Sequence, residues 1–177
     1  MTFGSALPAF VSAQALDQTH SRFGFELRTR WGQVIVGNFP RFEGEVGDLA
    51  DGRRQVRIRV ATASVKVNGS ERYTRFARGE RFLDAAQYPW VEFQSEPYSG
   101  ELVRAGGLLR GTLNLRGITR QETFVLAPSD CPRPALDCDV VAQGTISRAN
   151  YGLQTWRWAL TDAVRFNLRV RLQAAPL

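Results

Sequence analysis

The sequence has few of the residues on which metal-dependent and imidazole-dependent chemistry is usually built. It holds a single histidine, His20, and only two cysteines, Cys131 and Cys138. One histidine excludes a metal site made of several imidazoles and leaves one imidazole as a general base. Asp17, His20 and Ser21 lie within one short stretch, where their spacing does not build the converging geometry of a catalytic triad. We therefore expect a structural His20, no catalytic or metal-binding residues and no enzyme activity.

Long apolar runs and phosphate-binding loops are also absent. No stretch approaches the roughly 18 apolar residues that a membrane-spanning helix needs, and no glycine-rich phosphate loop is present. No repeat or linker divides the 177 residues, so a single domain over 16–177 is expected. Residues 1–15 are expected to be a loose segment or the remnant of a signal peptide, because 11–13 (Val-Ser-Ala) have the small-residue spacing of a cleavage site.

Lysine is almost missing, so the positive charge comes from arginine. Lys66 is the one lysine among 23 basic residues, and the net charge is +6. This balance favours acidic partners, including nucleic acid. The arginines are spread along the chain, however, and the phenylalanines alternate with them on the valine and leucine face, whereas a nucleic-acid-binding sheet exposes its aromatic residues. We expect no nucleic-acid partner, and a basic nucleic-acid-binding module is the less favoured alternative.

Alternation of apolar and polar residues is the main pattern that is present. In "VRFNLRVRLQ" (164–173) every second residue is apolar and arginines occupy most of the other positions, which is typical of a strand with one buried face. Similar stretches predict an all-β domain with antiparallel strands, closed into a barrel or split into a sandwich. The eight expected strands are 21–27, 33–49 (bent or bulged), 54–67, 89–95, 106–117, 120–127, 139–147 and 163–173.

One segment breaks the alternation and predicts a helical crossover. Tyr73 and Phe76 have helical spacing, Ser70 is a suitable N-cap, and Gly79 is a suitable stop. Residues 82–86 are expected to add a second helical turn. Because this is the only such segment, the crossover connects two strands of an antiparallel fold and no βαβ rhythm is expected.

The two cysteines lie in an expected exposed loop, "SDCPRPALDCDV". Their spacing is too wide for the usual pair of zinc ligands, and no second pair exists. A Cys131–Cys138 disulfide would close a ring worth about 2.5 kcal/mol in the chain-entropy model and would indicate an oxidising compartment. Two free thiols in a cytosolic protein are the alternative.

Five segments carry further motifs in a fixed order. They are "LDQTHSRFGFEL", "GNFPRFEGEV" (Gly37, Phe39, Phe42, Gly44), "VATASVKV" with "ERYTRFARGERFLDAAQYPWVEFQS", "GTLNLRGITRQETF" (Gly111, Leu113, Gly117, Thr119) and "TISRANYGL" (Arg148, Tyr151, Gly152). Together they resemble the YceI-like family of polyisoprenoid-binding, lipocalin-like bacterial proteins over residues 16–173. The sequence departs from that pattern at Tyr73, where an aspartate usually follows the arginine, and at 29–31, where the family often has a histidine.

The resemblance implies an eight-stranded antiparallel lipocalin-like barrel with one short helical crossover and a long internal tunnel. It also implies a periplasmic or secreted bacterial protein that carries or sequesters an isoprenoid chain, such as a quinone or polyprenyl phosphate, with no cofactor required. Arg72 and Arg75 are candidate head-group contacts, and Trp156 and Trp158 are expected in a loop or strand entrance at a tunnel mouth. A filled barrel acting as a structural or interaction protein is the alternative, and a homodimer is left open. The expected tunnel lining is Phe23, Phe25, Val34, Val36, Phe39, Val56, Ile58, Val60, Val91, Phe93, Leu113, Leu115, Phe124, Phe166, Leu168 and Val170.

Overall fold

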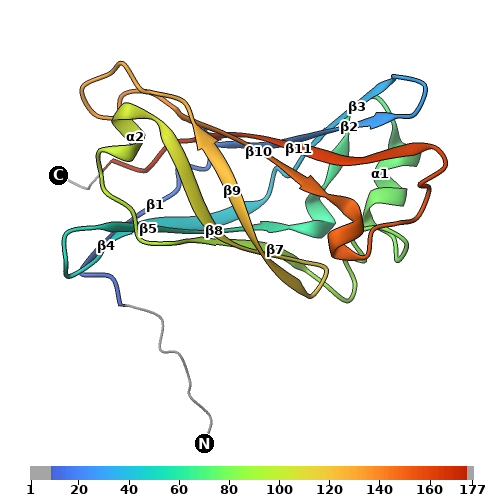
Figure 1. The fold of residues 1–177 in the computed structure, drawn as a ribbon, viewed down its shortest axis with the longest axis horizontal. Coiled ribbons are helices and arrows are strands. Elements are labelled where there is room, and N and C mark those ends of the chain that lie inside the picture. Colours follow the sequence, from blue (N-terminus) through green and yellow to red (C-terminus); the bar gives the residue numbers. More distant parts are fainter. Residues whose placement is uncertain (1–8, 175–177) are drawn as a thin grey trace, which may run out of the picture.

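The computed structural model describes residues 9–174, which form one curled antiparallel sheet with short helices at its ends (Figure 1). The strands are β1 (Ser12–Ala15), β2 (Arg22–Thr29), β3 (Val34–Asn38), β4 (Phe42–Asp48), β5 (Arg54–Ala61), β6 (Lys66–Val67), β7 (Trp90–Ser95), β8 (Gly107–Leu115), β9 (Ile118–Leu126), β10 (Val140–Ser147) and β11 (Leu160–Val170). The helices are α1 (Glu71–Arg78), α2 (Leu102–Ala105) and two 3₁₀ turns, Thr62–Ser64 and Arg148–Tyr151.

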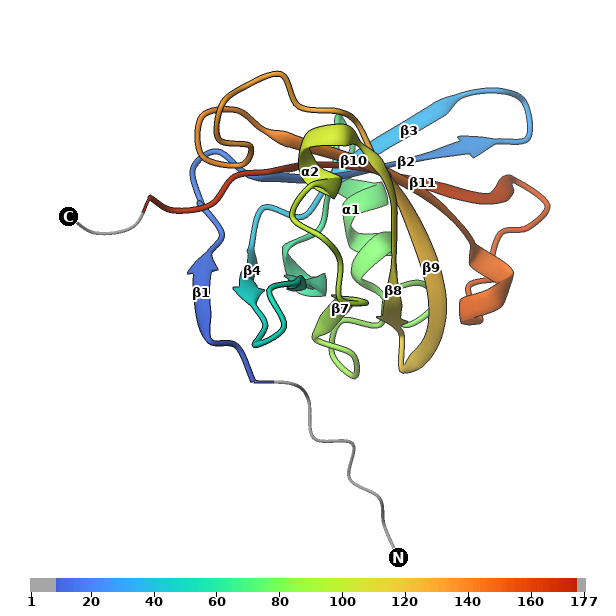
Figure 2. The same cartoon turned by 60° about the vertical axis from the view of Figure 1, so that its left-hand side comes forward.

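The sheet order is β1-β4-β5-β7-β8-β9-β10-β11-β2-β3-β6, and every pairing is antiparallel. The all-β expectation is confirmed, whereas the expected eight-stranded closed barrel is wrong. Eleven strands form a half-barrel in the described residues, with β1 and β6 at the two ends of the sheet order. Figure 2 shows the curl of this sheet. One seam brings the chain ends together: Leu16 and Leu172 form an isolated bridge, and the Asp17 amide donates to the Arg171 carbonyl at 2.8 Å.

The extra strands come from three places. Ser12–Ala15, expected in a loose segment, pair with β4, while residues 1–8 of that segment lie outside the described residues. The expected bent strand at 33–49 is two strands, because the chain turns at Phe39–Arg41 and passes from the β2 side of the sheet to the β5 side. The expected strand at 54–67 is interrupted by the turn Thr62–Ser64, after which Lys66 and Val67 pair with β3.

The arginine rows lie on the outer face of the sheet. Arg59 on β5 contacts Glu43 across the strand pair, and Arg165 on β11 lies 3.7 Å from Glu26 on β2. Oppositely charged residues that are paired across neighbouring strands stabilise a sheet modestly. The apolar residues between these arginines, such as Phe166 on β11, face the interior.

The helical crossover forms where its sequence predicts it. In α1 the Ser70 hydroxyl accepts a hydrogen bond from the Tyr73 amide at 3.0 Å, and Gly79 ends the helix. The expected helical turn at 82–86 is an irregular turn, and the second helix is α2 instead. Both helices lie at ends of the curled sheet, α1 at one end and α2 at the other (Figure 1).

The hairpin between β8 and β9 shows how local sequence fixes the register. Arg116 and Gly117 both have positive φ values, 52° and 74°, which a two-residue hairpin of type I′ requires. Leu115 therefore pairs with Ile118, and Leu113 and Leu115 point into the core.

Among residues 9–174, no helix is long and apolar enough to cross a membrane.

Candidate functional site

The end of the sheet nearest α1 encloses a cavity of about 310 Å³, which we call cavity 1. Its wall is almost entirely aliphatic and aromatic, and the polar exceptions are Thr29, Arg72, Tyr73 and Arg148. Binding sites for apolar molecules have this composition, a hydrophobic wall with a few placed polar groups. The apolar wall comprises Phe25, Leu27, Trp31, Ile35, Phe39, Val67, Phe76, Ala77, Phe82, Leu83, Val91, Leu115, Ile146, Leu153, Trp156, Trp158, Ala159, Leu160, Val164 and Phe166.

Aromatic side chains gather at the mouth of cavity 1. The rings of Trp156 and Trp158 are 5.5 Å apart, and the ring of Phe76 on α1 is 6.0 Å from Trp156. Trp31, from the turn between β2 and β3, and Trp158 are 66% and 71% exposed. Trp156 and Trp158 lie, as expected, in a loop that leads into a strand, and both side chains line cavity 1.

Arg148 fixes the loop that carries these tryptophans. It is 2% exposed, and it donates to the carbonyls of Leu153 at 2.8 Å, Thr155 at 3.0 Å and Thr161 at 3.1 Å. Burial lowers the pKa of its guanidinium, and the Asp162 carboxylate opposes part of that shift. Arginine stays charged in proteins, so Arg148 holds the segment 153–161 with three charge-assisted hydrogen bonds.

A second cavity of about 510 Å³ lies at the α2 end, and we call it cavity 2. Val56, Ile58 and Leu168 are part of its wall, but its rim is more polar and includes Asp48, Arg54, Glu101, Arg104 and Arg133. Arg54 and Arg133 form ion pairs with Asp48 and Asp137. The wall also contains Pro132, Pro134 and Leu136, so the loop closed by the disulfide helps to form this cavity.

The Tyr98 side chain also lines cavity 2. Burial raises the pKa of its hydroxyl to about 12, while Arg54 lowers it and Asp48 raises it. A phenol with a raised pKa stays neutral at physiological pH, and it can therefore donate a hydrogen bond in this cavity.

A layer of packed side chains lies between the two cavities. Phe23, Phe42, Val60 and Leu113 are each at most 8% exposed and line neither cavity. Along β11, Phe166 lines cavity 1 and Leu168 lines cavity 2. The interior is therefore two cavities with a packed layer between them, and the expected single long tunnel is replaced by this arrangement.

The sixteen residues expected to line a tunnel fall into four groups in the structure. Those of cavity 1 are Phe25, Phe39, Val91, Leu115 and Phe166; those of cavity 2 are Val56, Ile58, Phe93, Phe124, Leu168 and Val170; those of the packed layer are Phe23, Val60 and Leu113; and those on the outer face are Val34 and Val36.

The inward assignment of Val34 and Val36 is wrong. They are 41% and 42% exposed, and Ile35 between them lines cavity 1. The cause is Gly37, which lies opposite Phe25 on β2: a Cβ atom there would come within 2.3 Å of the Phe25 ring. The inner face of β3 is thus Ile35 and Gly37, in phase with Phe39.

Of the two expected head-group residues, Arg72 lines cavity 1, while Arg75 is exposed and lies outside the lining.

His20 and Ser21 lie where the first and last strands of the fold meet. The His20 imidazole Nδ1 lies 2.8 Å from a carboxylate oxygen of Asp17. Ser21 is buried and both accepts from and donates to the Arg171 backbone at 3.0 Å, so it fastens the seam between the chain ends.

Two further observations concern the cysteines and metals. Cys131 and Cys138 form the expected disulfide. Within residues 9–174, no group of three or more His, Cys, Asp or Glu side chains is arranged to hold a metal ion.

Sequence reasoning missed part of the wall of cavity 1. Leu83 comes from the irregular segment after α1, and Leu153 comes from the loop that Arg148 holds. Neither lies on an alternating strand, so no periodicity marks it. Trp31 and Tyr73, the positions at which the sequence departs from the YceI-like pattern, both lie at the mouth.

The fold defines a class of protein, a curled antiparallel sheet with a largely apolar cavity at one end and a second cavity with a more polar rim at the other. The sequence profile of the YceI-like domain matches residues 14–173. The chain belongs to the YceI-like family.

Curated relatives and solved structures are also similar to this chain. UPF0312 protein SA2479 of Staphylococcus aureus (strain N315) is 23% identical over 167 residues, which cover 90% of this chain and 92% of the relative. The crystal structure of BcnA from Burkholderia cenocepacia matches with a TM-score of 0.66 at 18% identity, covering 90% of this chain and 99% of the other. A structure described as a polyisoprenoid binding domain from Saccharophagus degradans matches with a TM-score of 0.67 at 16% identity, covering 91% and 98%. At these identities the structures establish the shared fold.

Proposed function

We propose that this protein binds a long-chain isoprenoid, or a similar amphiphilic lipid of the quinone or polyprenyl phosphate type, and carries or sequesters it without altering it. The observation that carries the proposal is cavity 1, an apolar space with an aromatic mouth inside a YceI-like fold. A structural neighbour described as a polyisoprenoid binding domain supports the ligand class. Removing apolar surface from water supplies the binding free energy, at about 25 cal/mol per Å².

The apolar chain is assigned to cavity 1 and the polar head to its mouth. Arg72 lies at that mouth with its guanidinium carbon 5.6 Å from the centre of the Phe76 ring. Its forked donors suit a phosphate or a quinone oxygen. Arg75 lies three residues further along α1 and outside the cavity lining, and we assign it to a head group that extends beyond the mouth.

We also propose a periplasmic or secreted location. The Cys131–Cys138 disulfide supports it, because disulfides persist mainly in oxidising compartments. The ion pairs on the outer face support an aqueous environment for the arginine rows.

The experiment is native mass spectrometry of the full chain purified from bacteria, followed by solvent extraction and identification of the released lipid. Val164 lines cavity 1 and is partly buried, so Val164→Trp should fill the cavity and abolish the adduct. Val125→Trp is the matched control, since Val125 is 54% exposed on the outer face. A parent protein that never carries lipid, even after reconstitution with a quinone, would favour the filled interaction module instead.

A further inference from the structure

Three separate segments expose large aromatic side chains around the mouth of cavity 1. They are the β2–β3 turn with Trp31, helix α1 with Tyr73 and Phe76, and the loop before β11 with Trp158. Their exposed fractions are 66%, 42%, 41% and 71% in that order. A contiguous exposed patch of this kind marks an interaction surface, whereas single exposed apolar residues need no explanation.

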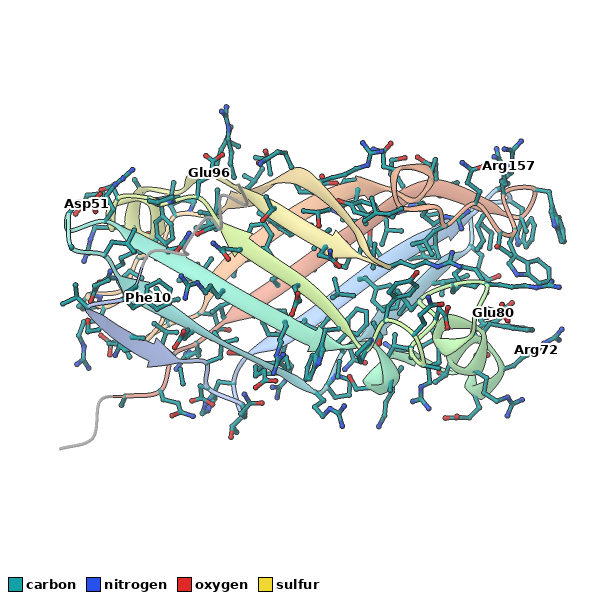
Figure 3. All side chains as sticks on the ribbon, turned by 90° about the horizontal axis from the view of Figure 1, so that it is seen from below. Phe10, Asp51, Arg72, Glu80, Glu96 and Arg157 are labelled. Atoms are coloured by element: carbon teal, nitrogen blue, oxygen red, sulfur yellow. A yellow bond between two sulfur atoms is a disulfide. The ribbon has the colours of Figure 1, made fainter. Side chains whose placement is uncertain are left out.

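Four exposed arginines lie at this end, close to the aromatic side chains. Arg30, Arg72, Arg75 and Arg157 are exposed, and none of them is in an ion pair among residues 9–174. Figure 3 shows Arg72 and Arg157 at the same end of the molecule, where Glu80 also lies, with Asp51 and Glu96 toward the other end. Seven other arginines form ion pairs with carboxylates, and these are Arg53, Arg54, Arg59, Arg133, Arg165, Arg169 and Arg171. Arg110 on β8, away from the mouth, is exposed and has no ion pair among residues 9–174 either, so the mouth is set apart by arginines that lie beside exposed aromatic rings.

We infer that this aromatic and arginine-rich end, the mouth surface, docks on an anionic lipid bilayer and that cavity 1 exchanges its chain with that bilayer. The mouth surface comprises Trp31, Tyr73, Phe76, Trp158 and the four arginines named above. The inference rests on the proposed function for the cargo, but docking itself needs no cargo.

The chemistry of the mouth surface fits a bilayer interface. Tryptophan and tyrosine are enriched at the head-group level of membranes, where an apolar ring with a polar tip is favoured. Arginines without a carboxylate partner are attracted to anionic lipids. An isoprenoid chain that leaves a bilayer through this mouth passes from one apolar medium to another, with Trp156 and Phe76 between the two.

The test is vesicle co-sedimentation of the delipidated full chain at 0.15 M salt, a condition at which long-range charge effects are screened beyond about 8 Å. Vesicles of phosphatidylcholine with phosphatidylglycerol are compared with vesicles of phosphatidylcholine alone. We expect Trp31→Ser with Trp158→Ser to lower the partition coefficient by at least about tenfold, through lost apolar insertion. The matched control is Leu108→Ser with Val125→Ser, two exposed residues paired across β8 and β9 away from the mouth. That control should change binding by less than about twofold.

Charge is tested separately with residues outside the cavity lining. Arg75→Gln with Arg157→Gln should lower binding to the anionic vesicles by about fivefold per arginine. Arg53→Gln with Arg110→Gln removes the same net charge away from the mouth and should have little effect. If both pairs lower binding equally, net charge alone explains it and the inference is overturned.

A fluorescence measurement locates the contact. In a Trp90→Phe background the three remaining tryptophans, Trp31, Trp156 and Trp158, all line the mouth of cavity 1. Brominated lipids should quench their emission. Absence of quenching, or absence of binding to anionic vesicles, overturns the inference. A protein that docks but retains no isoprenoid refutes the proposed function instead, and a protein that retains the chain without docking refutes only the inference.

Discussion

Phe23 and Phe42 lie in contact across the middle of the curled sheet, with their ring centroids 4.6 Å apart. They come from β2 and β4, which are not neighbours in the sheet order. This contact, with Val60 and Leu113, forms the packed layer between the two cavities. Under the proposed function, this layer of few side chains limits the length of the isoprenoid chain that cavity 1 can hold.

Phe42→Ala tests that limit. The change should lower the free energy of unfolding by about 3–5 kcal/mol, as for other large-to-small changes of buried phenylalanines. It should also let the protein retain longer isoprenoids than the parent, because the cavities would join. Urea denaturation and competitive loading with a series of chain lengths measure the two effects. An unchanged length preference in a folded variant would argue that the layer does not set the limit.

Ile58→Trp distinguishes the two cavities. Ile58 lines cavity 2 and is only partly buried, so a larger ring has room there. The change should lower the free energy of unfolding by less than the roughly 1–3 kcal/mol that is typical of an overpacked core site. If the chain occupies cavity 1 alone, Ile58→Trp keeps the lipid adduct that Val164→Trp loses. Loss of the adduct in both variants would show that the chain extends through both cavities.

Arg148→Met should loosen the loop of the mouth tryptophans. The three carbonyls that Arg148 contacts would lose charge-assisted hydrogen bonds, and the free energy of unfolding should fall by about 3 kcal/mol. Arg148→Lys is the matched control for charge, because one ammonium cannot reproduce the fork and should recover only part of the loss. Amide hydrogen exchange of residues 153–161 should become faster in both variants. Unchanged exchange rates would show that Arg148 does not stabilise this loop.

The disulfide contributes through the unfolded chain. Cys131→Ser with Cys138→Ser opens a ring of sequence separation 7, and the free energy of unfolding should fall by about 2.5 kcal/mol. Thiol titration of the parent under denaturing, non-reducing conditions should find no free thiol. Two reactive thiols in protein isolated from its native compartment would contradict both the bond and the proposed location.

Tyr98 makes stability depend on alkaline pH. Its folded pKa of about 12 exceeds its ordinary value of 10.0, so the neutral form stabilises the fold fully below pH 10 and this contribution is lost as pH rises from 10 through 12. In Tyr98→Phe that part of the alkaline loss should disappear. Urea unfolding at pH 9 and pH 11 with absorbance at 295 nm measures it, and equal losses in both proteins would assign the effect to other groups.

The sequence predicted the structure well where the residues of a single strand or helix determine its faces and its ends. The alternation of 164–173 predicted the inner and outer faces of β11, and Ser70 with Gly79 predicted the bounds of α1. It was misleading at Val34 and Val36, where β-branched residues that suit a buried strand lie outside because Gly37 accommodates the ring of Phe25. Which face a short strand buries depends here on a neighbour, which a single run of residues does not show.

The division of the interior was beyond sequence reasoning for a similar reason. Phe23 and Val60 point inward, as do the residues that line a cavity. Whether an inward side chain packs against another one, as Phe23 does against Phe42, or borders empty space depends on the distance between the facing parts of the sheet. The aromatic mouth was partly predictable, since Trp156 and Trp158 stood outside any strand. Trp31 was visible only as a departure from the YceI-like pattern.

The seam between the chain ends also orders the events of synthesis. Residues 15–17 bond to residues 171–173, and Ser21 holds Arg171 across 150 positions of the chain. Contacts so far apart in sequence form late, because the entropy of closing the intervening loop must be overcome first. A ribosome must therefore synthesise the chain as far as residue 173 before this edge can form, and until then the apolar interior is open to chaperones that recognise unfolded chains.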